Sequence, residues 1–257
     1  MGRAVALVTG ASAGLGVEFA RQLAQAGNDL VLVARDRERL EQVAKQVEAD
    51  HGVTAEVLVA DLTDPAQLAT VEERVRTVDT LVNNAGFGTF GKFYELDLAT
   101  ELREVQLNIV ALMCLTHAAA QAMAERGAGG ILNVSSLAGF QCGPSNGTYS
   151  ATKAFVTSFT EAVHQEMKGT GVKVTVLCPG FTRTEFQARA NVPGEDVPGF
   201  LWQDPPIVVK TGLDGLAKNK AIVMPGALNK ALGNFSDIAP RGLTRMLSGE
   251  ILRRSGH

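Results

Sequence analysis

Short apolar runs alternate with longer helical patterns along the chain, and this alternation limits the possible folds more than any other feature. The runs are rich in Val, Leu and Ile without strict polar alternation, which is typical of strands buried on both faces. They occupy residues 4–9, 29–34, 55–60, 80–85, 130–136, 173–180 and 221–226. The helical patterns occupy residues 14–26, 36–50, 65–77, 100–126, 149–169 and 207–218.

Alternation of this kind predicts a doubly wound, seven-stranded parallel sheet. Because crossovers between parallel strands are right-handed, helices should cover both faces and give a Rossmann-like, three-layer α/β/α fold. A length of 257 residues suits one α/β domain. We therefore predict a single domain over 1–257. The irregular stretch 184–206, which contains Pro and Gly, is expected to be a substrate lid, and 225–257 a C-terminal tail.

Composition excludes several functional classes. The formal net charge is −3, so the chain lacks the basic field of a nucleic-acid-binding protein. Its cysteines, Cys114, Cys142 and Cys178, are three in number and far apart, which argues against a disulfide framework, and none has metal-ligand spacing. We expect no metal. The N-terminus runs straight into a strand, and we expect no signal peptide, no spanning helix and a cytoplasmic location.

A glycine-rich turn, TGASAGLG at 9–16, follows the first predicted strand and precedes the first helix. Glycines at such a turn permit close approach of the backbone to a pyrophosphate at the helix N-terminus. The residues expected to contact a dinucleotide here are Gly10, Ser12, Ala13, Gly14, Leu15 and Gly16. On its own, a purely structural turn would explain this composition as well.

The end of the second predicted strand bears on the choice of cofactor. An acidic residue there would bind the ribose 2′-hydroxyl of NAD, whereas a basic residue would bind the 2′-phosphate of NADP. Ala34 offers no carboxylate, and the Arg35 guanidinium suits a phosphate. Asp36 complicates this interpretation, and Arg35, Arg37 and Arg39 also fit a solvated helix start. We predict NADP(H), with NAD(H) as the alternative.

Tyr149 and Lys153 lie four residues apart at the start of a predicted helix, and so share one helical face. An unperturbed phenol is too weak an acid–base group for neutral pH. The positive charge of Lys153 is expected to favour the phenolate and lower the pKa of Tyr149. A lone pair with this spacing would more often be a surface pair.

Seven motifs in order give the chain a resemblance to the short-chain dehydrogenase/reductase family. They are TGASAGLG (9–16), ADLTD (60–64), NNAG (83–86), LNIVA (107–111), NVSS (133–136), YSATK (149–153) and PGFTRT (179–184). The resemblance implies a catalytic set of Asn108, Ser136, Tyr149 and Lys153. In that set Tyr149 exchanges the proton, Ser136 holds the substrate oxygen, Lys153 also binds the nicotinamide ribose, and Asn108 holds a relay water.

The resemblance also implies further cofactor contacts. Asp61 and Leu62 match the adenine site. Asn83, Ala85 and Gly86 belong to the turn beneath the adenosine ribose, although Asn83 could mainly tie strands together. The segment that binds the nicotinamide carboxamide is matched by Pro179, Gly180, Thr182 and Thr184.

The expected substrate walls are residues 137–148 and the lid. Their apolar side chains predict an apolar or lipid-like carbonyl compound, although some could instead pack the lid onto the domain. The candidates are Phe140, Cys142, Phe186, Phe200, Leu201 and Trp202. The tail carries a basic and apolar helical pattern, which is better explained by protein packing than by membrane-surface contact.

The predicted function is that of an NADP(H)-dependent oxidoreductase interconverting a carbonyl and a secondary alcohol, with a ketoacyl or steroid-like substrate. Two alternatives are a non-catalytic NADP-binding regulator and a sugar-nucleotide epimerase or dehydratase. The intact catalytic set disfavours the regulator, and the short C-terminal region disfavours the epimerase. The resemblance further implies a homodimer or homotetramer assembled through 100–126 and 149–169.

Overall fold

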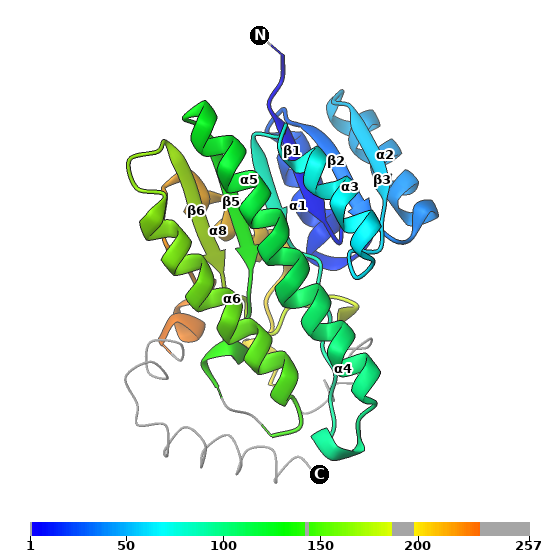
Figure 1. Ribbon diagram of the computed structural model, residues 1–257, viewed down its shortest axis with the longest axis vertical. Coiled ribbons are helices and arrows are strands. Elements are labelled where there is room, and N and C mark those ends of the chain that lie inside the picture. Colours follow the sequence, from blue (N-terminus) through cyan, green and yellow to red (C-terminus); the bar gives the residue numbers. More distant parts are fainter. Residues whose placement is uncertain (1, 142–143, 187–197, 232–257) are drawn as a thin grey trace.

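The computed structural model describes residues 2–141, 144–186 and 198–231. Figure 1 shows a twisted sheet with helices on both sides. All seven strands are parallel, in the order β3-β2-β1-β4-β5-β6-β7. This confirms the predicted Rossmann-like sheet.

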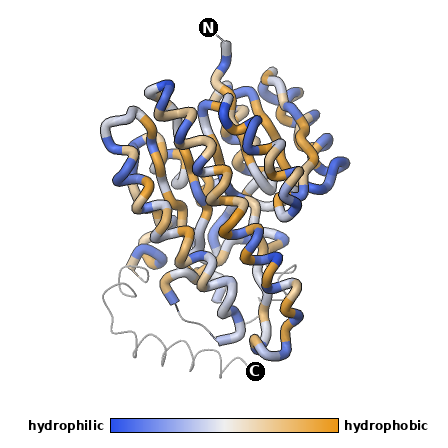
Figure 2. Tube along the Cα trace, in the orientation of Figure 1, coloured by the Kyte–Doolittle hydropathy of each residue, from blue (hydrophilic) through white to orange (hydrophobic). Residues whose placement is uncertain are grey.

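The strands match the seven apolar runs and are shorter than most of them. They are β1 (Val5–Thr9), β2 (Asp29–Ala34), β3 (Ala55–Val59), β4 (Thr80–Asn83), β5 (Gly129–Val134), β6 (Val172–Leu177) and β7 (Ile222–Val223). The central strands are almost fully buried, as their continuous apolar character predicts. Figure 2 shows hydrophobic residues concentrated along the strands and on the helix sides that face them.

The helices form one layer on each face of the sheet. One face carries α1 (Gly14–Gln25), α2 (Arg37–His51) and α8 (Pro205–Ala217). The other carries α3 (Pro65–Val75), α4 (Leu98–Val105), α5 (Leu112–Arg126) and α6 (Gly147–Glu166). Short 3-10 turns lie at Phe93–Glu95, Leu137–Phe140 and Gly199–Leu201. Each layer packs its own apolar core against the sheet.

The long helix expected at 100–126 differs from the prediction. A π-helical segment, Gln106–Ala111, joins α4 to α5. The continuous stretch Leu98–Arg126 is also long and apolar enough, by length and composition, to cross a membrane. Our expectation that the chain lacks such a stretch was therefore wrong. In the structure, α5 buries Leu115, Ala119 and Met123 in the core against the sheet, which explains its apolar character.

A buried polar network connects the middle of the sheet to the helices above it. The Asn83 side-chain amide donates to Asn133 Oδ1 (2.9 Å) and to Thr116 Oγ1 (3.0 Å). The Asn133 amide donates to Thr160 Oγ1 at 3.0 Å. The network thus joins β4 and β5 to α5 and α6.

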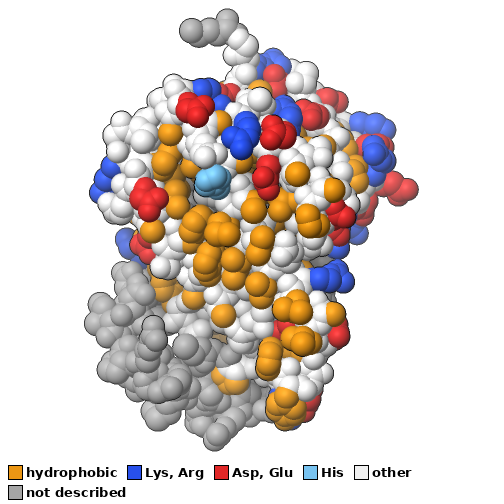
Figure 3. Space-filling model, in the orientation of Figure 1, with side chains coloured by type: hydrophobic (Ala, Val, Ile, Leu, Met, Phe, Trp, Pro, Cys, Tyr) orange, Lys and Arg blue, Asp and Glu red, His pale blue; other side chains and the backbone are white. Residues whose placement is uncertain are grey.

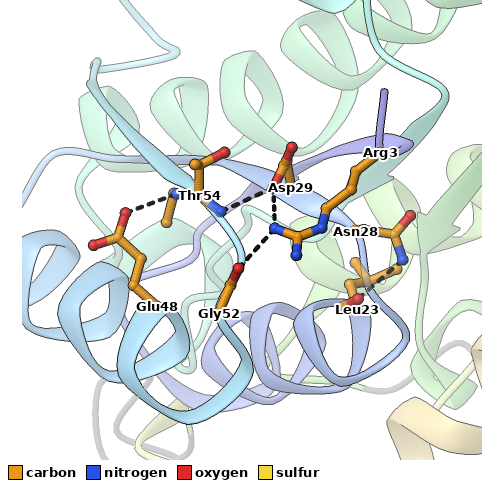
Figure 4. A network of polar contacts seen from close by, with 8 residues as sticks. Arg3, Leu23, Asn28, Asp29, Glu48, Gly52 and Thr54 are labelled. Carbon is orange, nitrogen blue, oxygen red and sulfur yellow. Dashed lines mark hydrogen bonds and ion pairs between the residues drawn. The ribbon is translucent and has the colours of Figure 1, made fainter. Parts of the chain in front are cut away.

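A second network anchors the amino ends of the strands, away from the site (Figure 4). Arg3 donates to the Gly52 carbonyl at 2.7 Å and lies 3.6 Å from the Asp29 carboxylate. Asp29 in turn accepts from the Thr54 backbone N–H at 2.8 Å. These contacts fix the entry of β3 beside β2.

The strand order reverses between β1 and β4, which lie side by side although β2 and β3 separate them in sequence. The connections that leave these two strands therefore diverge and open a crevice at their carboxyl ends. Ligands of open α/β sheets bind at such a position.

We predict that Asn133→Ala destabilises the protein by about 2–3 kcal/mol, because it removes two buried hydrogen bonds, one accepted from the Asn83 amide and one donated to the Thr160 hydroxyl. Urea unfolding measures the change. Thr70→Ala, which removes an exposed hydroxyl on α3, is the control and should change the unfolding free energy by less than about 0.5 kcal/mol. Equal effects of the two substitutions would contradict the prediction.

Candidate active site

The turn between β1 and α1 leaves no room for side chains at two of its glycines. A Cβ at Gly16 would lie 2.0 Å from the Gly10 carbonyl oxygen, and Gly10 itself has a φ of +66°. Ala13 is the N-cap of α1 and makes no side-chain cap. The first N–H groups of α1 therefore point into the crevice without a side-chain acceptor, as a pyrophosphate-binding turn requires.

The predicted nicotinamide segment lies against this same turn. A Cβ at Gly14 would lie 3.3 Å from Thr184 Cβ. Thr182 is buried and bridges to Gln203. The structure thus brings together the glycine turn and the 179–184 segment, although they are far apart in the sequence.

Thr9 ties the ends of β1 and β4 together. Its hydroxyl accepts from the backbone N–H groups of Asn84 (3.0 Å) and Ala85 (2.9 Å). The Asn84 side-chain amide donates a hydrogen bond to the Thr9 carbonyl at 2.9 Å. Thr9 and Asn84 belong to the TGASAGLG and NNAG motifs of the sequence analysis, which gave no sign that their side chains join the two strand ends.

The end of β2 presents Arg35 to solvent, with 68% of its side chain exposed and its guanidinium 3.9 Å from Asp61. Asp61 also accepts from the backbone and the hydroxyl of Thr63. Burial alone would raise the pKa of Asp61. The Thr63 hydrogen bonds and the charge of Arg35 outweigh that effect, so the pKa is lowered. Asp36 caps α2 by accepting from the Arg39 N–H at 3.1 Å. The carboxylate that complicated the cofactor prediction therefore has a structural role.

Two predicted cofactor residues direct their side chains elsewhere. Leu62 is buried in the hydrophobic core beneath α3 and α5. Asn83 belongs to the buried network described above, so its second interpretation, tying strands together, is correct. Neither side chain lies on the surface of the crevice.

Ser136, Tyr149 and Lys153 come together beyond the carboxyl end of β5. Ser136 is close enough to Tyr149 for its hydroxyl to act on the pKa of the phenol, and the Lys153 amine lies 5.8 Å from the centre of the Tyr149 ring. Ser135 instead bonds the Lys153 carbonyl at 2.7 Å. The structure thus separates the two adjacent serines, and it places the predicted one, Ser136, beside the phenol.

Burial dominates the acid–base properties of this group. It raises the pKa of Tyr149 to about 12, against the effect of the Ser136 hydroxyl and with help from the negative charge of Glu104. The same burial lowers the pKa of Lys153 to about 8, although Glu104 opposes that shift. The net result at Tyr149 is a raised pKa, dominated by desolvation, and the expectation that Lys153 lowers the pKa of Tyr149 stays a prediction.

Asn108 lies in the π-helical segment and is buried. Its amide donates to the Phe87 carbonyl (2.8 Å) and to Thr152 Oγ1 (3.1 Å), while its oxygen accepts from the Phe87 N–H (3.2 Å). The side chain therefore joins α6 to the loop after β4. The relay water expected at Asn108 stays a prediction.

The predicted substrate-lining residues lie in different parts of the structure, and not all of them are near the site. Phe186 lies next to the site, with its ring centre 5.6 Å from that of Tyr149. Phe140 packs instead on the small core cluster beneath α6. Trp202 packs against Phe181 and Arg183 at an open hollow. Phe200 is exposed. Cys142 lies outside the described residues, as do residues 187–197 of the predicted lid.

Sequence reasoning missed several residues that shape the site. A Cβ at Gly88 would lie 2.7 Å from the Tyr149 ring, and one at Gly139 would lie 2.7 Å from the backbone of Lys153. Glu104, one turn before Asn108, is fully buried. The Gly86-x-Gly88 spacing was an available signal for the first position, whereas a glutamate in a helix normally indicates a solvated face.

Comparison with known proteins agrees with this geometry. A model of the short chain dehydrogenase family matches residues 4–193. The chain belongs to the short-chain dehydrogenase family.

Relatives of this short-chain dehydrogenase share most of its length. It is 39% identical to the ketoacyl reductase HetN of Nostoc over 73% of this chain and 67% of the relative. A short-chain dehydrogenase from Sphingobium yanoikuyae, solved in complex with NADPH, matches with a TM-score of 0.83 and 34% identity, over 93% of this chain and 97% of that one. A 7β-hydroxysteroid dehydrogenase matches with a TM-score of 0.86 and 28% identity, over 95% and 96%.

Membership makes the protein an oxidoreductase of a family that binds a nicotinamide cofactor, acts on small molecules and is commonly oligomeric. The residues present fit that cofactor. The glycine turn would hold the pyrophosphate, and Lys153 and Thr184 border the crevice between the turn and Tyr149.

We predict that Gly16→Ala weakens nicotinamide cofactor binding at least about tenfold, because the new methyl group collides with the Gly10 carbonyl and displaces the phosphate turn. Fluorescence titration measures the affinity. The matched control is Gly147→Ala, where a Cβ meets nothing within 4 Å. Unchanged affinity in a folded Gly16→Ala protein would contradict the assignment.

Proposed function

We propose that this protein is an NADPH-dependent carbonyl reductase that converts a ketone into a secondary alcohol, with Tyr149 as the general acid. The observation that carries the proposal is the grouping of Ser136, Tyr149 and Lys153 in one crevice with the glycine turn. A hydroxyl donor, a phenol and a buried amine are the groups that carbonyl reduction needs beside a hydride donor.

Three residues of the chain have separate roles in the proposed reaction. The bound, reduced nicotinamide supplies a hydride to the carbonyl carbon. Ser136 donates a hydrogen bond to the carbonyl oxygen as negative charge develops there. Tyr149 gives its proton to that oxygen and completes the alcohol, and the phenol is later reprotonated from solvent. The charge of Lys153 stabilises the transient phenolate.

Reduction and oxidation start from different forms of Tyr149. The protonated phenol begins a reduction as the acid that donates to the carbonyl oxygen, whereas oxidation of an alcohol begins from the phenolate.

The NADP preference rests on the end of β2. Arg35 is exposed at the position that meets the adenosine ribose 2′-group in this fold. Ala34 supplies no carboxylate, and Asp36 is engaged as the cap of α2. The NADPH bound to the Sphingobium relative supports the same choice.

For the substrate, we infer an apolar ketone of the ketoacyl or steroid-like class. Phe186 places an aromatic ring against Tyr149, and two of the relatives are a ketoacyl reductase and a hydroxysteroid dehydrogenase. We also infer a homo-oligomer assembled through the α4–α5 face. Figure 3 shows hydrophobic side chains gathered on that side, where Leu98, Leu102 and Met113 are exposed.

The proposed role of Tyr149 predicts that Tyr149→Phe lowers kcat at least about 100-fold while NADPH affinity stays within about twofold, because the substitution removes only the proton donor. NADPH oxidation is followed with β-ketoacyl thioesters, ketosteroids, diketones and aldehydes. Phe159→Tyr, which adds a hydroxyl further along α6, is the control and should retain turnover. Retained turnover in Tyr149→Phe would contradict the assignment of Tyr149 as the general acid. Tight NADPH binding without turnover by the wild type would favour a non-catalytic regulator.

The proposed role of Arg35 predicts that Arg35→Ala weakens NADPH binding about tenfold and leaves NADH binding unchanged, since only NADPH would offer the guanidinium a 2′-phosphate. Arg21→Ala, which removes a guanidinium paired with Glu18 on α1, is the matched control. If Arg35→Ala weakens the binding of both cofactors equally, or of neither, Arg35 does not distinguish the 2′-group of NADPH from that of NADH.

A further inference from the structure

Glu104, in the last turn of α4, is fully buried beside the candidate active site. One oxygen, Oε2, accepts from the Thr89 N–H (3.0 Å) and from the Thr89 hydroxyl (3.1 Å). The other, Oε1, is buried and has no hydrogen-bond partner among the described residues. A buried carboxyl with one oxygen unpartnered is costly to keep, so it needs an explanation.

The charged and titratable groups around Glu104 come from two helices. On its own helix, Glu101 bonds the hydroxyls of Thr89 and Thr148. The helix α6 packs against α4 and carries Tyr149 and Lys153. The charge of Glu104 raises the pKa of both groups. From the loop before α4, Lys92 and Glu95 pair with each other at the surface. Cys178 faces Lys153 from the end of β6.

Lys153 has an equally unusual environment. Its side chain is buried, and its amine donates to the Val134 carbonyl at 2.9 Å. The carboxylate that acts on this amine is Glu104. Two ionisable groups buried on adjacent, packed helices thus act on each other, and Glu104 makes the largest charge contribution at Lys153.

We propose that Glu104 is a positioning residue for the carbonyl reduction inferred above: it is the buried counter-charge that keeps Lys153 and Tyr149 in their protonated, working forms. The proposal rests on the proposed function for its catalytic consequence. Its structural basis, the coupling of Glu104 with Lys153, is independent of any substrate.

The sign of the effect follows from charge. A negative Glu104 favours the ammonium form of Lys153 and disfavours the phenolate form of Tyr149, so it raises the pKa of both groups. Burial raises the pKa of Glu104 itself to about 7, with a further contribution from Glu101. Above that pH Glu104 carries its charge, which is the range in which Lys153, with a pKa of about 8, would otherwise lose its proton.

The first experiment is the pH dependence of kcat/KM for NADPH-driven ketone reduction. Glu104→Gln keeps the shape of the side chain and removes its charge. The alkaline limb of the kcat/KM profile should therefore move to lower pH by about one unit. Glu104→Asp keeps the charge and should return the limb toward its wild-type position. Glu95→Gln is the matched control, because Glu95 pairs with Lys92 at the surface and acts on none of the three buried groups. An alkaline limb that stays in place in Glu104→Gln would overturn the proposal.

A second experiment needs no turnover. Unfolding midpoints at pH 8 are compared for the wild type, Glu104→Gln, Lys153→Met and the double variant. If Glu104 is the counter-charge of Lys153, Glu104→Gln lowers the midpoint when Lys153 is present and leaves or raises it in the Lys153→Met background. Equal shifts in both backgrounds would overturn the inference. Coupling in this cycle without ketone reduction by the wild type would instead reject the proposed function.

Discussion

The junction of β1 and β4 is the contact on which the rest of the site depends. These strands are neighbours in a parallel sheet, yet their connections leave in opposite directions and open a crevice at the carboxyl edge. The Thr9 hydroxyl accepts from two backbone N–H groups at the start of the loop after β4 and holds both strand ends in register. That loop then contacts Asn108 through Phe87 and covers the Tyr149 ring at Gly88. The glycine turn, α4 and α6 are thereby placed around one space.

Burial determines the chemistry of that space. Packed protein replaces water around Lys153 and partly around Tyr149, which favours the neutral form of the amine and the neutral form of the phenol. The negative charge of Glu104 opposes the effect on the amine and reinforces the effect on the phenol. The packing of α4 on α6 therefore sets the charges of the groups at the site.

Much of the fold followed from sequence because strands buried on both faces have continuous apolar character, and because glycine spacing and the Tyr149–Lys153 interval are local signals. Other features need three dimensions. The π-helical segment at Gln106–Ala111 does not interrupt the helical pattern of side chains. Leu62 was assigned from the family resemblance and Phe140 from residue type. In the structure Leu62 lies in the core beneath α3 and α5, and Phe140 packs against the small cluster beneath α6. The direction of the Tyr149 pKa shift required its burial to be known, and Glu104 resembled an ordinary exposed helix residue until α4 was seen packed on α6.

The central claim is that the site passes hydride to a carbonyl carbon, and isotope transfer tests it most directly. The wild-type protein is incubated with a ketoacyl thioester or ketosteroid and NADPH carrying deuterium on one or the other face of the nicotinamide C4. The account predicts that one labelled form delivers its deuterium to the carbinol carbon of the product alcohol, in step with NADPH consumption, while the other retains its label. An alcohol without deuterium from either form, or bound NADPH that is never oxidised, would contradict it.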